Sequence, residues 1–120
     1  MIRIRRVYDK PAKSDGYRIL IDRLWPRGIK KSELTFEAWE KDLAPSSPLR
    51  RAFGHNPEHW ARFRSDYRKE LQSGAAREKI RSIAELARKR NVTLLYSARD
   101  EEHNNAVVVQ GLIQKELAKL

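Results

Sequence analysis

The sequence predicts an α/β protein: a small layered domain of about three strands, in a mostly parallel or mixed sheet, with four to five helices. Strand-like segments alternate with helical stripes along the chain, which is typical of one layered α/β structure. Hydrophobic residues make up 40% and charged residues 35% of the 120 residues, a balance typical of a folded, highly soluble chain. No repeat, low-complexity tract or flexible linker divides the chain, so we expect a single domain over residues 1–120.

Three segments have the pattern of strands. Met1–Tyr8 alternates isoleucine with arginine, the period of two that marks a half-exposed strand. Tyr17–Asp22 and Val92–Ser97 contain continuous aliphatic runs, as expected for strands buried on both faces. The eight-residue connection Asp9–Gly16 is too short for a helical crossover of ordinary length. The first two strands are therefore either an antiparallel pair or parallel with a non-helical connection.

Two short helices are predicted next along the chain. We expect one near Thr35–Lys41, where two aromatic residues three apart share a face. The other begins at Ser47 and Pro48, a cap followed by a first-turn proline, and Gly54 is well placed to end it.

Three longer helices follow. Asn56 and Pro57 begin the first and Gly74 ends it; the second covers Ala76–Arg90 and the third Glu102–Ala118. Each has apolar residues at helical spacing, which predicts one buried face. The stripes comprise Trp60, Phe63, Tyr67 and Leu71 in the first, Ala76, Ile80, Ile83, Ala84 and Ala87 in the second, and Ala106, Val109, Leu112, Ile113 and Leu117 in the third.

Composition excludes several classes of protein. Because the chain has no Cys, it has no disulfide framework, zinc ribbon or thiol nucleophile, and it fits a reducing cytoplasm. No apolar run is long enough to span a membrane, and the charged first ten residues show no secretory signal. We therefore expect a cytoplasmic protein with no membrane partner.

Positive charge suggests an anionic partner. The chain has 26 Lys and Arg against 16 Asp and Glu, a net charge of +10. Such an excess favours nucleic acid, although solubility alone would also explain it. The excess is concentrated in residues 1–31, with ten basic and three acidic residues.

The first candidate site follows the second predicted strand. Asp22, Arg23, Trp25 and Arg27 come directly after the buried run, and ligands of open α/β sheets collect at the carboxyl ends of strands. Two guanidinium groups there suit a phosphate or carboxylate, and the indole offers a flat face. The alternative is that Asp22 pairs with Arg23 while Trp25 packs in the core.

The second candidate site follows the third predicted strand, in residues 97–105. We expect Asp100 to cap the last helix, with Arg99 just before it and His103 in the first helical turn. A histidine there can donate or accept a proton. The alternative is that Asp100 only caps while His103 and Asn104 are surface residues.

A third candidate, His55, lies in a turn between helices, where local hydrogen bonding is the alternative role. The three histidines, His55, His59 and His103, lack a compact ligand spacing, so we expect no metal. The sequence also lacks the Walker, G-x-G-x-x-G, G-x-S-x-G and H-E-x-x-H motifs, and no cofactor is expected.

Four strings carry a family resemblance from Val7 to Val109: VYDKPAKSDGYRILIDRLWPRGIKK, WEKDLAPSSPLRRAFGH, W-x-x-F-x-x-x-Y-x-x-EL and VTLLYSARDEEHNNAVVV. They resemble the YeaO-like branch of the bacterial family called domain of unknown function 488. The resemblance implies a single α/β domain with no established activity.

Another branch of that family has a D-V-R string at a strand end, to which Asp22-Arg23 is similar. It also has a strand ending in Cys, followed by Cys-His-Arg. Here Tyr96 stands in place of the first Cys and His103-Asn104-Asn105 in place of the second group. The thiol is missing, but an Asp/Arg strand end and a nearby His are retained. We name Tyr96 and His55 as accessory candidates.

If the second and third predicted strands are parallel neighbours, the two polar loops meet at one edge of the sheet. We expect a pocket there for an anionic ligand, a nucleotide or phosphoester; whether the protein is an enzyme stays open. Catalysis would fall to His103 as proton carrier and Asp22 as base or orienting group. The binding residues are expected to be Arg23, Trp25, Arg27, Arg99 and Asn104.

Two other functions remain open. One is a basic nucleic-acid-binding module, whose affinity would fall steeply with salt. The other is an interaction protein, so the chain is expected to be a monomer or a homodimer through its aromatic helices. The nucleic-acid surface would comprise Arg3, Arg5, Arg6, Lys10, Lys13, Lys30 and Lys31, with Arg77, Arg81 and Arg88.

Overall fold

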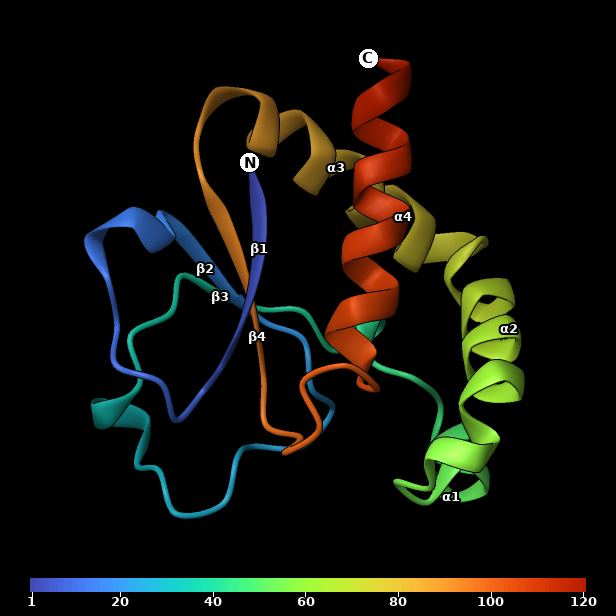
Figure 1. The fold of residues 1–120 in the computed structure, drawn as a ribbon. Coiled ribbons are helices and arrows are strands. Elements are labelled where there is room, and N and C mark those ends of the chain that lie inside the picture. Colours follow the sequence, from blue (N-terminus) through green and yellow to red (C-terminus); the bar gives the residue numbers. More distant parts are fainter.

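A four-stranded parallel sheet lies at the centre of the computed structural model, which describes residues 1–120 (Figure 1). The strand order is β1-β4-β2-β3, and β4 pairs with a parallel neighbour on each side. All five residues of β4 are buried, as its continuous aliphatic run predicts. The α/β class is therefore confirmed. The strands are β1 (Ile2–Arg6), β2 (Tyr17–Leu20), β3 (Ala38–Trp39) and β4 (Val92–Tyr96).

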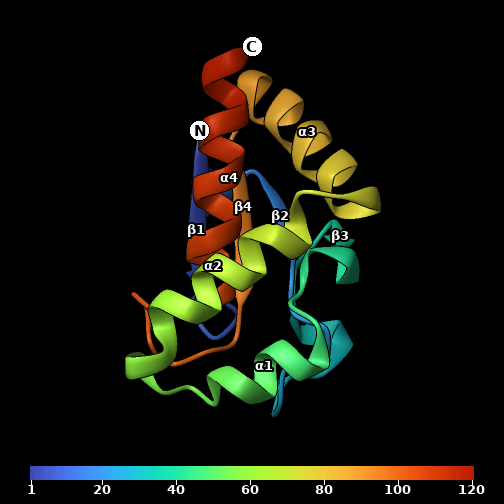
Figure 2. The same cartoon turned by 90° about the vertical axis from the view of Figure 1, so that its right-hand side faces the viewer.

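Helices cover only one face of this sheet. Figures 1 and 2 show α3 and α4 against it, with α2 crossing the lower end of α4 and α1 below α2. The main hydrophobic core lies between sheet and helices and includes the stripes expected from helical spacing. No helix has both the length and the apolar composition that crossing a membrane requires. The helices are α1 (Ser47–Phe53), α2 (Trp60–Leu71), α3 (Gly74–Lys89) and α4 (Asn105–Lys119).

Loops cover the opposite face, where a second, smaller cluster is buried (Figure 1). Side chains alternate along β2, so Ile19 faces the helices while Leu20 faces the loops. This is why three consecutive aliphatic residues are all buried here. The second cluster comprises Val7, Leu20, Leu34 and Leu95, with Trp25, Ile29, Phe36 and Trp39 packed against it.

The prediction of a helix near Thr35–Lys41 is wrong. This segment contains the short strand β3, which pairs with β2 and is followed by a 3-10 turn at Lys41–Leu43. The backbone N–H groups of Glu37 and Glu40 donate to carbonyls of β2, at 2.8 Å each. Hydrogen bonding to an open sheet edge replaces a helix of seven residues, which is too short to be stable alone.

The beginning of the last helix also differs from the prediction. Helix α4 begins at Asn105 rather than Glu102, and its cap is Asn104, whose backbone is extended and whose Oδ1 accepts from Val107 N. Asp100 instead closes a separate turn, and His103 lies before the helix rather than in its first turn. Gly74 begins α3, whereas α2 has already ended at Leu71.

The first two strands are parallel, with a non-helical connection, which was one of the two alternatives left open. They are not neighbours, because β4 lies between them. Their connection contains a 3-10 turn, Lys13–Asp15, that ends at Gly16 with φ of +65°. A Cβ at this position would overlap the carbonyl of Asn91, so the turn requires glycine.

Candidate functional site

The loops after β2 and β4 meet at the carboxyl edge of the sheet, and Asp22 joins them. Its Oδ2 accepts hydrogen bonds from the backbone N of Ser97 at 3.0 Å and from the Ser97 hydroxyl at 2.6 Å. Its Oδ1 accepts from Asn105 Nδ2 at 3.0 Å, and the same amide reaches the Ile21 carbonyl at 3.3 Å. Asp22 Oδ2 thus holds the loop after β2 to the loop after β4, and Oδ1 holds it to the beginning of α4.

Arg6, at the end of β1, extends this hydrogen-bonded edge. Its Nε donates to the Ala98 carbonyl at 2.9 Å and its Nη2 to the Ser97 carbonyl at 3.2 Å. The guanidinium also lies over the Tyr8 ring, 4.8 Å from its centroid. Arg6 therefore fixes the loop after β4, a role that the sequence pattern did not indicate.

Trp25 packs inside the second cluster. Its indole N–H donates to the Ile29 carbonyl at 2.6 Å, and its ring lies 5.7 Å from Phe36 and 5.5 Å from Trp39. The ring is half-buried, and Lys31 lies 5.9 Å over it. These contacts are those of a core residue, the alternative that the sequence left open for this side chain.

The two arginines beside Trp25 differ in their surroundings. The guanidinium of Arg23 donates to the carbonyls of Pro45 at 3.4 Å and Ala44 at 3.5 Å, which ties the loop after β2 to the segment before α1. Arg27 is exposed and its side chain makes no hydrogen bond or ion pair. Its carbonyl accepts from the Tyr8 hydroxyl at 2.8 Å. Only Arg27 of this pair presents a free guanidinium.

Asp100 and His103 form the most polar part of the second loop. The Asp100 carboxylate accepts from the backbone N of Glu102 and of His103, and its Oδ2 lies 2.9 Å from His103 Nδ1. These hydrogen bonds, that from Glu102 first, lower the pKa of Asp100. Arg99, just before this pair, is exposed and has no side-chain partner.

Of the remaining candidates, Asn104 and Tyr96 are buried close to each other, whereas His55 is exposed. Asn104 is 2% exposed, and its amide donates to the Asp100 carbonyl at 2.9 Å while its oxygen caps α4. Tyr96 is buried, and burial raises the pKa of its hydroxyl, with smaller effects from nearby carboxylates. His55 is exposed in a left-handed turn with φ of 55°, its ring 6.2 Å from Phe53.

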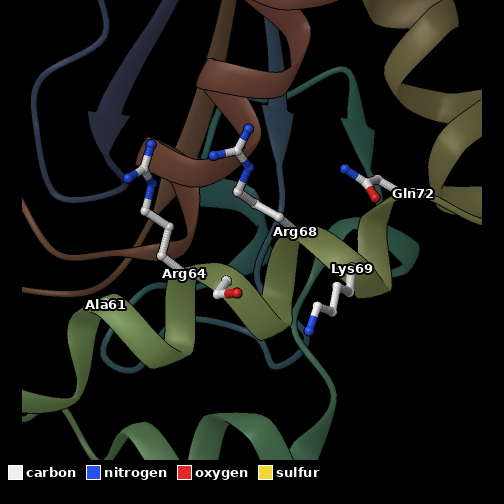
Figure 3. A pocket seen from close by; sticks show the side chains of 6 residues that line it. Ala61, Arg64, Arg68, Lys69 and Gln72 are labelled. Atoms are coloured by element: carbon white, nitrogen blue, oxygen red, sulfur yellow. The ribbon is translucent and has the colours of Figure 1, made fainter.

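An open hollow of about 340 Å³ runs along α2, outside every candidate set expected from the sequence. Figure 3 shows Arg64 and Arg68 extending toward α4, while Lys69 lies on the opposite side of α2. None of the three makes an ion pair or hydrogen bond within the chain. The lining residues, from α2 and its C-cap, are Ala61, Arg64, Ser65, Arg68, Lys69 and Gln72.

Helical spacing explains this placement. Trp60, Arg64 and Arg68 are four residues apart, so they share one side of α2. The Trp60 ring meets the His103 ring edge-on, with centroids 5.2 Å apart, so this side of α2 faces the loop after β4. The same spacing is visible in the sequence as two arginines beside an aromatic stripe. It did not single out a site, because basic residues on a helix face are usually only solvated.

Five of the ten basic residues expected to form the nucleic-acid surface make an ion pair or a hydrogen bond within the chain. Arg5 pairs with Asp15 at 3.3 Å, and Arg3 donates to the Ser14 hydroxyl at 2.9 Å. On the helices, Arg81 and Arg88 lie 3.8 and 3.9 Å from glutamates. No three His, Asp or Glu side chains are grouped as metal ligands. Arg64, Arg68 and Lys69 have no such partner and lie together on one helix.

Comparison with known proteins identifies relatives over almost the whole chain. The family model described as "Inactive DUF488-N3 subclade" matches residues 1–120. The uncharacterised protein YeaO of Escherichia coli (strain K12) is 46% identical over 108 residues, covering 90% of this chain and 92% of the relative. An uncharacterised protein of Mycobacterium tuberculosis (strain H37Rv) is 37% identical over 112 residues, covering 93% and 92%. No solved structure matches the chain.

Proposed function

The chain is a YeaO-like member of the DUF488 family, in the subclade described as inactive, and from this premise we propose that it binds phosphate-bearing ligands without catalysing their reaction. Nucleic acid is the ligand that its surface fits best. The protein would act in the cytoplasm, as a monomer or homodimer.

The observation that carries this proposal is the basic hollow of α2. Its charged lining residues are all cationic: Arg64, Arg68 and Lys69. The two acidic residues of α2 are engaged elsewhere, because Asp66 pairs with Arg62 at 3.8 Å and Glu70 accepts from Ser46. Arginine and lysine without acidic neighbours are suited to phosphate oxygens. Since the hollow is open and lies along one helix, it suits an extended chain of phosphates better than an enclosed small molecule.

The use of polar side chains at the sheet edge supports binding rather than catalysis. Asp22, expected as a base, already accepts three hydrogen bonds through its two oxygens. The Asp100 carboxylate holds Nδ1 of His103 and leaves Nε2 free, so the case against catalysis rests on Asp22 and on the absence of a nucleophilic hydroxyl that donates to this ring. Base catalysis by Asp22 would need a carboxylate free to take a proton from a substrate. The word "inactive" in the description of the subclade agrees with this proposal.

A small phosphoester at the sheet edge is the second candidate. It is favoured by Arg27 and Arg99, which are exposed and free on the two loops joined through Asp22 and Ser97. In that case Arg23, Trp25 and Asn104 would position the loops, and His103 would donate a hydrogen bond to the ligand. His55 and Tyr96 would remain accessory to this site.

Fluorescence anisotropy with a labelled DNA duplex tests the first candidate. The double variant Arg64→Ala/Arg68→Ala should weaken binding by tenfold or more and reduce the slope of log affinity against log salt by about 0.9 for each phosphate that is no longer neutralised. The matched control Arg50→Ala/Arg51→Ala removes the same charge from exposed positions of α1 whose side chains have no partner. If the control weakens binding equally, net charge alone attracts the DNA and the α2 site is wrong.

Calorimetry with a nucleoside monophosphate tests the second candidate. The ligand binds at the sheet edge if binding is lost in Arg27→Ala/Arg99→Ala but kept in Arg64→Ala/Arg68→Ala. If the protein turns the nucleotide over and His103→Ala abolishes that turnover, the proposed absence of catalysis is wrong. Light scattering of the same samples gives the oligomeric state.

A further inference from the structure

Arg18 is a buried guanidinium with donors to spare. It belongs to β2, is 3% exposed, and lies on the loop-covered face of the sheet, two residues before Leu20. Its one side-chain hydrogen bond runs from Nη1 to Asp15 Oδ2 at 3.3 Å, and its Nε has no partner. A guanidinium carries five N–H donors, and a buried donor without a partner is costly.

The negative charge near Arg18 is shared. Asp15 also accepts from Arg5 Nη1, at 3.3 Å, so one carboxylate serves two guanidinium groups. Glu37 is close as well, but its Oε2 accepts from the backbone N of Arg18 at 2.6 Å. Asp15 is therefore the only carboxylate hydrogen-bonded to the Arg18 side chain, and it is shared with Arg5, while the Glu37 carboxylate attracts the guanidinium without a hydrogen bond to it.

Arg18 lines a hollow of about 280 Å³, and it is the only strand residue that does so. The rest of the lining comes from two loops, residues 7–11 and 28–34. The Tyr8 hydroxyl holds these loops together by donating to the Arg27 carbonyl at 2.8 Å. The apolar part of the wall comprises Val7, Pro11, Ile29 and Leu34.

Two carboxylates on the wall restrict the ligand. Asp9 uses Oδ2 to accept from the backbone N of Arg6 at 3.0 Å, and Glu33 uses Oε1 to accept from Lys30 N at 2.7 Å. The second oxygen of each carboxylate has no partner in the chain. Lys10 is the other cation of the lining. Two nearby carboxylates disfavour a phosphate dianion but can accept hydrogen bonds from an ammonium group.

We propose that this hollow binds the zwitterion of a small apolar amino acid. The Arg18 guanidinium donates to the ligand carboxylate, the free oxygens of Asp9 and Glu33 accept from its ammonium group, and the aliphatic wall contacts its side chain. The volume lies just below the range of about 300–1,000 Å³ that is usual for sites of drug-sized ligands, which suits a ligand as small as an amino acid. The site lies on the opposite face of the sheet from α2, so it is independent of the proposed phosphate binding.

Nuclear magnetic resonance with ¹⁵N-labelled protein tests this site, because the Nε–H group of a buried arginine gives its own signal. L-leucine is the probe. We expect it to shift the Arg18 Nε–H signal with a saturable dissociation constant on the order of 1 mM or tighter. Isocaproate, which lacks the ammonium group, should bind about tenfold more weakly. Isopentylamine and inorganic phosphate should leave the signal unchanged.

Three variants separate binding from folding. Arg18→Lys keeps the charge but loses the planar fork, and should weaken leucine binding at least tenfold. Arg3→Lys, on the same face of the sheet but hydrogen-bonded to Ser14, is the matched control and should bind leucine normally. Glu33→Gln retains an oxygen for the Lys30 N–H, so it should fold, yet it should lose the preference for leucine over isocaproate.

Each contrary result overturns the proposal. If leucine leaves the Arg18 signal unchanged, the hollow does not bind an amino acid. If phosphate or isocaproate binds as well as leucine, the site is a general anion site. If Glu33→Gln binds leucine like the unaltered protein, the ammonium contact is wrong, and this test holds even where Arg18→Lys fails to fold.

Discussion

Asp22 accepts two hydrogen bonds from Ser97 through one carboxylate oxygen, at 3.0 Å from its backbone N and 2.6 Å from its hydroxyl. The two residues are far apart in the sequence but end neighbouring parallel strands. The second oxygen holds Asn105, the first residue of α4. Asp22 is thus the point at which two strands and one helix are joined.

Replacing Asp22 should therefore reduce stability strongly. Asp22→Ala leaves the Ser97 and Asn105 donors without their acceptor and should lower the free energy of unfolding by about 3 kcal/mol, since hydrogen bonds to charged groups contribute more than neutral ones. Asp42→Ala, at an exposed carboxylate without a hydrogen bond, should change it by less than about 0.5 kcal/mol. Urea unfolding measures both, and equal values would contradict the structural role of Asp22.

The cap of α4 gives a second prediction. Asn104→Ala removes the acceptor for Val107 N and a buried donor to the Asp100 carbonyl, and should cost about 1–2 kcal/mol. Asn104→Asp keeps the capping oxygen and should cost less. Thermal unfolding followed by circular dichroism would show this order, and an Asp variant as unstable as the Ala variant would argue against capping.

Asp100 should titrate at low pH. Its pKa lies below the ordinary value of 3.8, mainly because the backbone N of Glu102 donates to its carboxylate and secondly because of His103. A depressed pKa means that the stabilisation is complete above the unfolded-state value and is lost as the pH falls through the folded-state value. Carboxyl ¹³C resonances measure this titration.

The variant His103→Ala dissects that effect. It removes the side-chain partner of Asp100 but leaves the Glu102 backbone hydrogen bond, so it should raise the pKa only part of the way toward 3.8. A midpoint at or above that value in the unaltered protein would contradict the structure of this turn.

Tyr67 should resist ionisation in alkali. Burial raises its pKa well above the ordinary value of 10.0, and the Asp22 and Glu70 carboxylates add to the shift. Its contribution to stability is therefore complete below about pH 10 and is lost as the pH rises toward the folded-state pKa. Ultraviolet titration should show that the last tyrosine ionises together with unfolding.

Tyr67→Phe supplies the control for that titration. It should remove the tyrosine that ionises last, leaving only the smaller delay of the buried Tyr96, and should cost about 1–2 kcal/mol at neutral pH, because the Leu43 carbonyl loses its hydroxyl donor. Tyr17→Phe, at a partly exposed tyrosine whose hydroxyl makes no hydrogen bond, should do neither. If Tyr67→Phe leaves the delayed step in place, another tyrosine is responsible.

Local sequence patterns predicted much of the fold, because buried residues recur along a helix or a strand with the period of its backbone. The three long helices and the three main strands were expected in the right order. The helix predicted around Phe36 and Trp39 was wrong because two aromatic residues three apart also occur where a short strand is followed by a turn. The conformation of this segment depends on the open edge of β2, which lies elsewhere in the sequence. The cap of α4 is Asn104 rather than the predicted Asp100, because the Asp100 carboxylate closes a separate turn.

The sequence alone determined that polar loops follow two buried strands, whereas the meeting of Asp22 with the loop containing His103 at one sheet edge depended on the parallel pairing of β2 with β4. Only the tertiary structure decided which polar groups remain free. Asp22, Arg23 and Arg6 find partners that are distant in the sequence, whereas Arg64 and Arg68 of α2 find none. The reason is physical: periodicity reports which face of a segment is buried, but a hydrogen-bond partner depends on which other segments pack beside it.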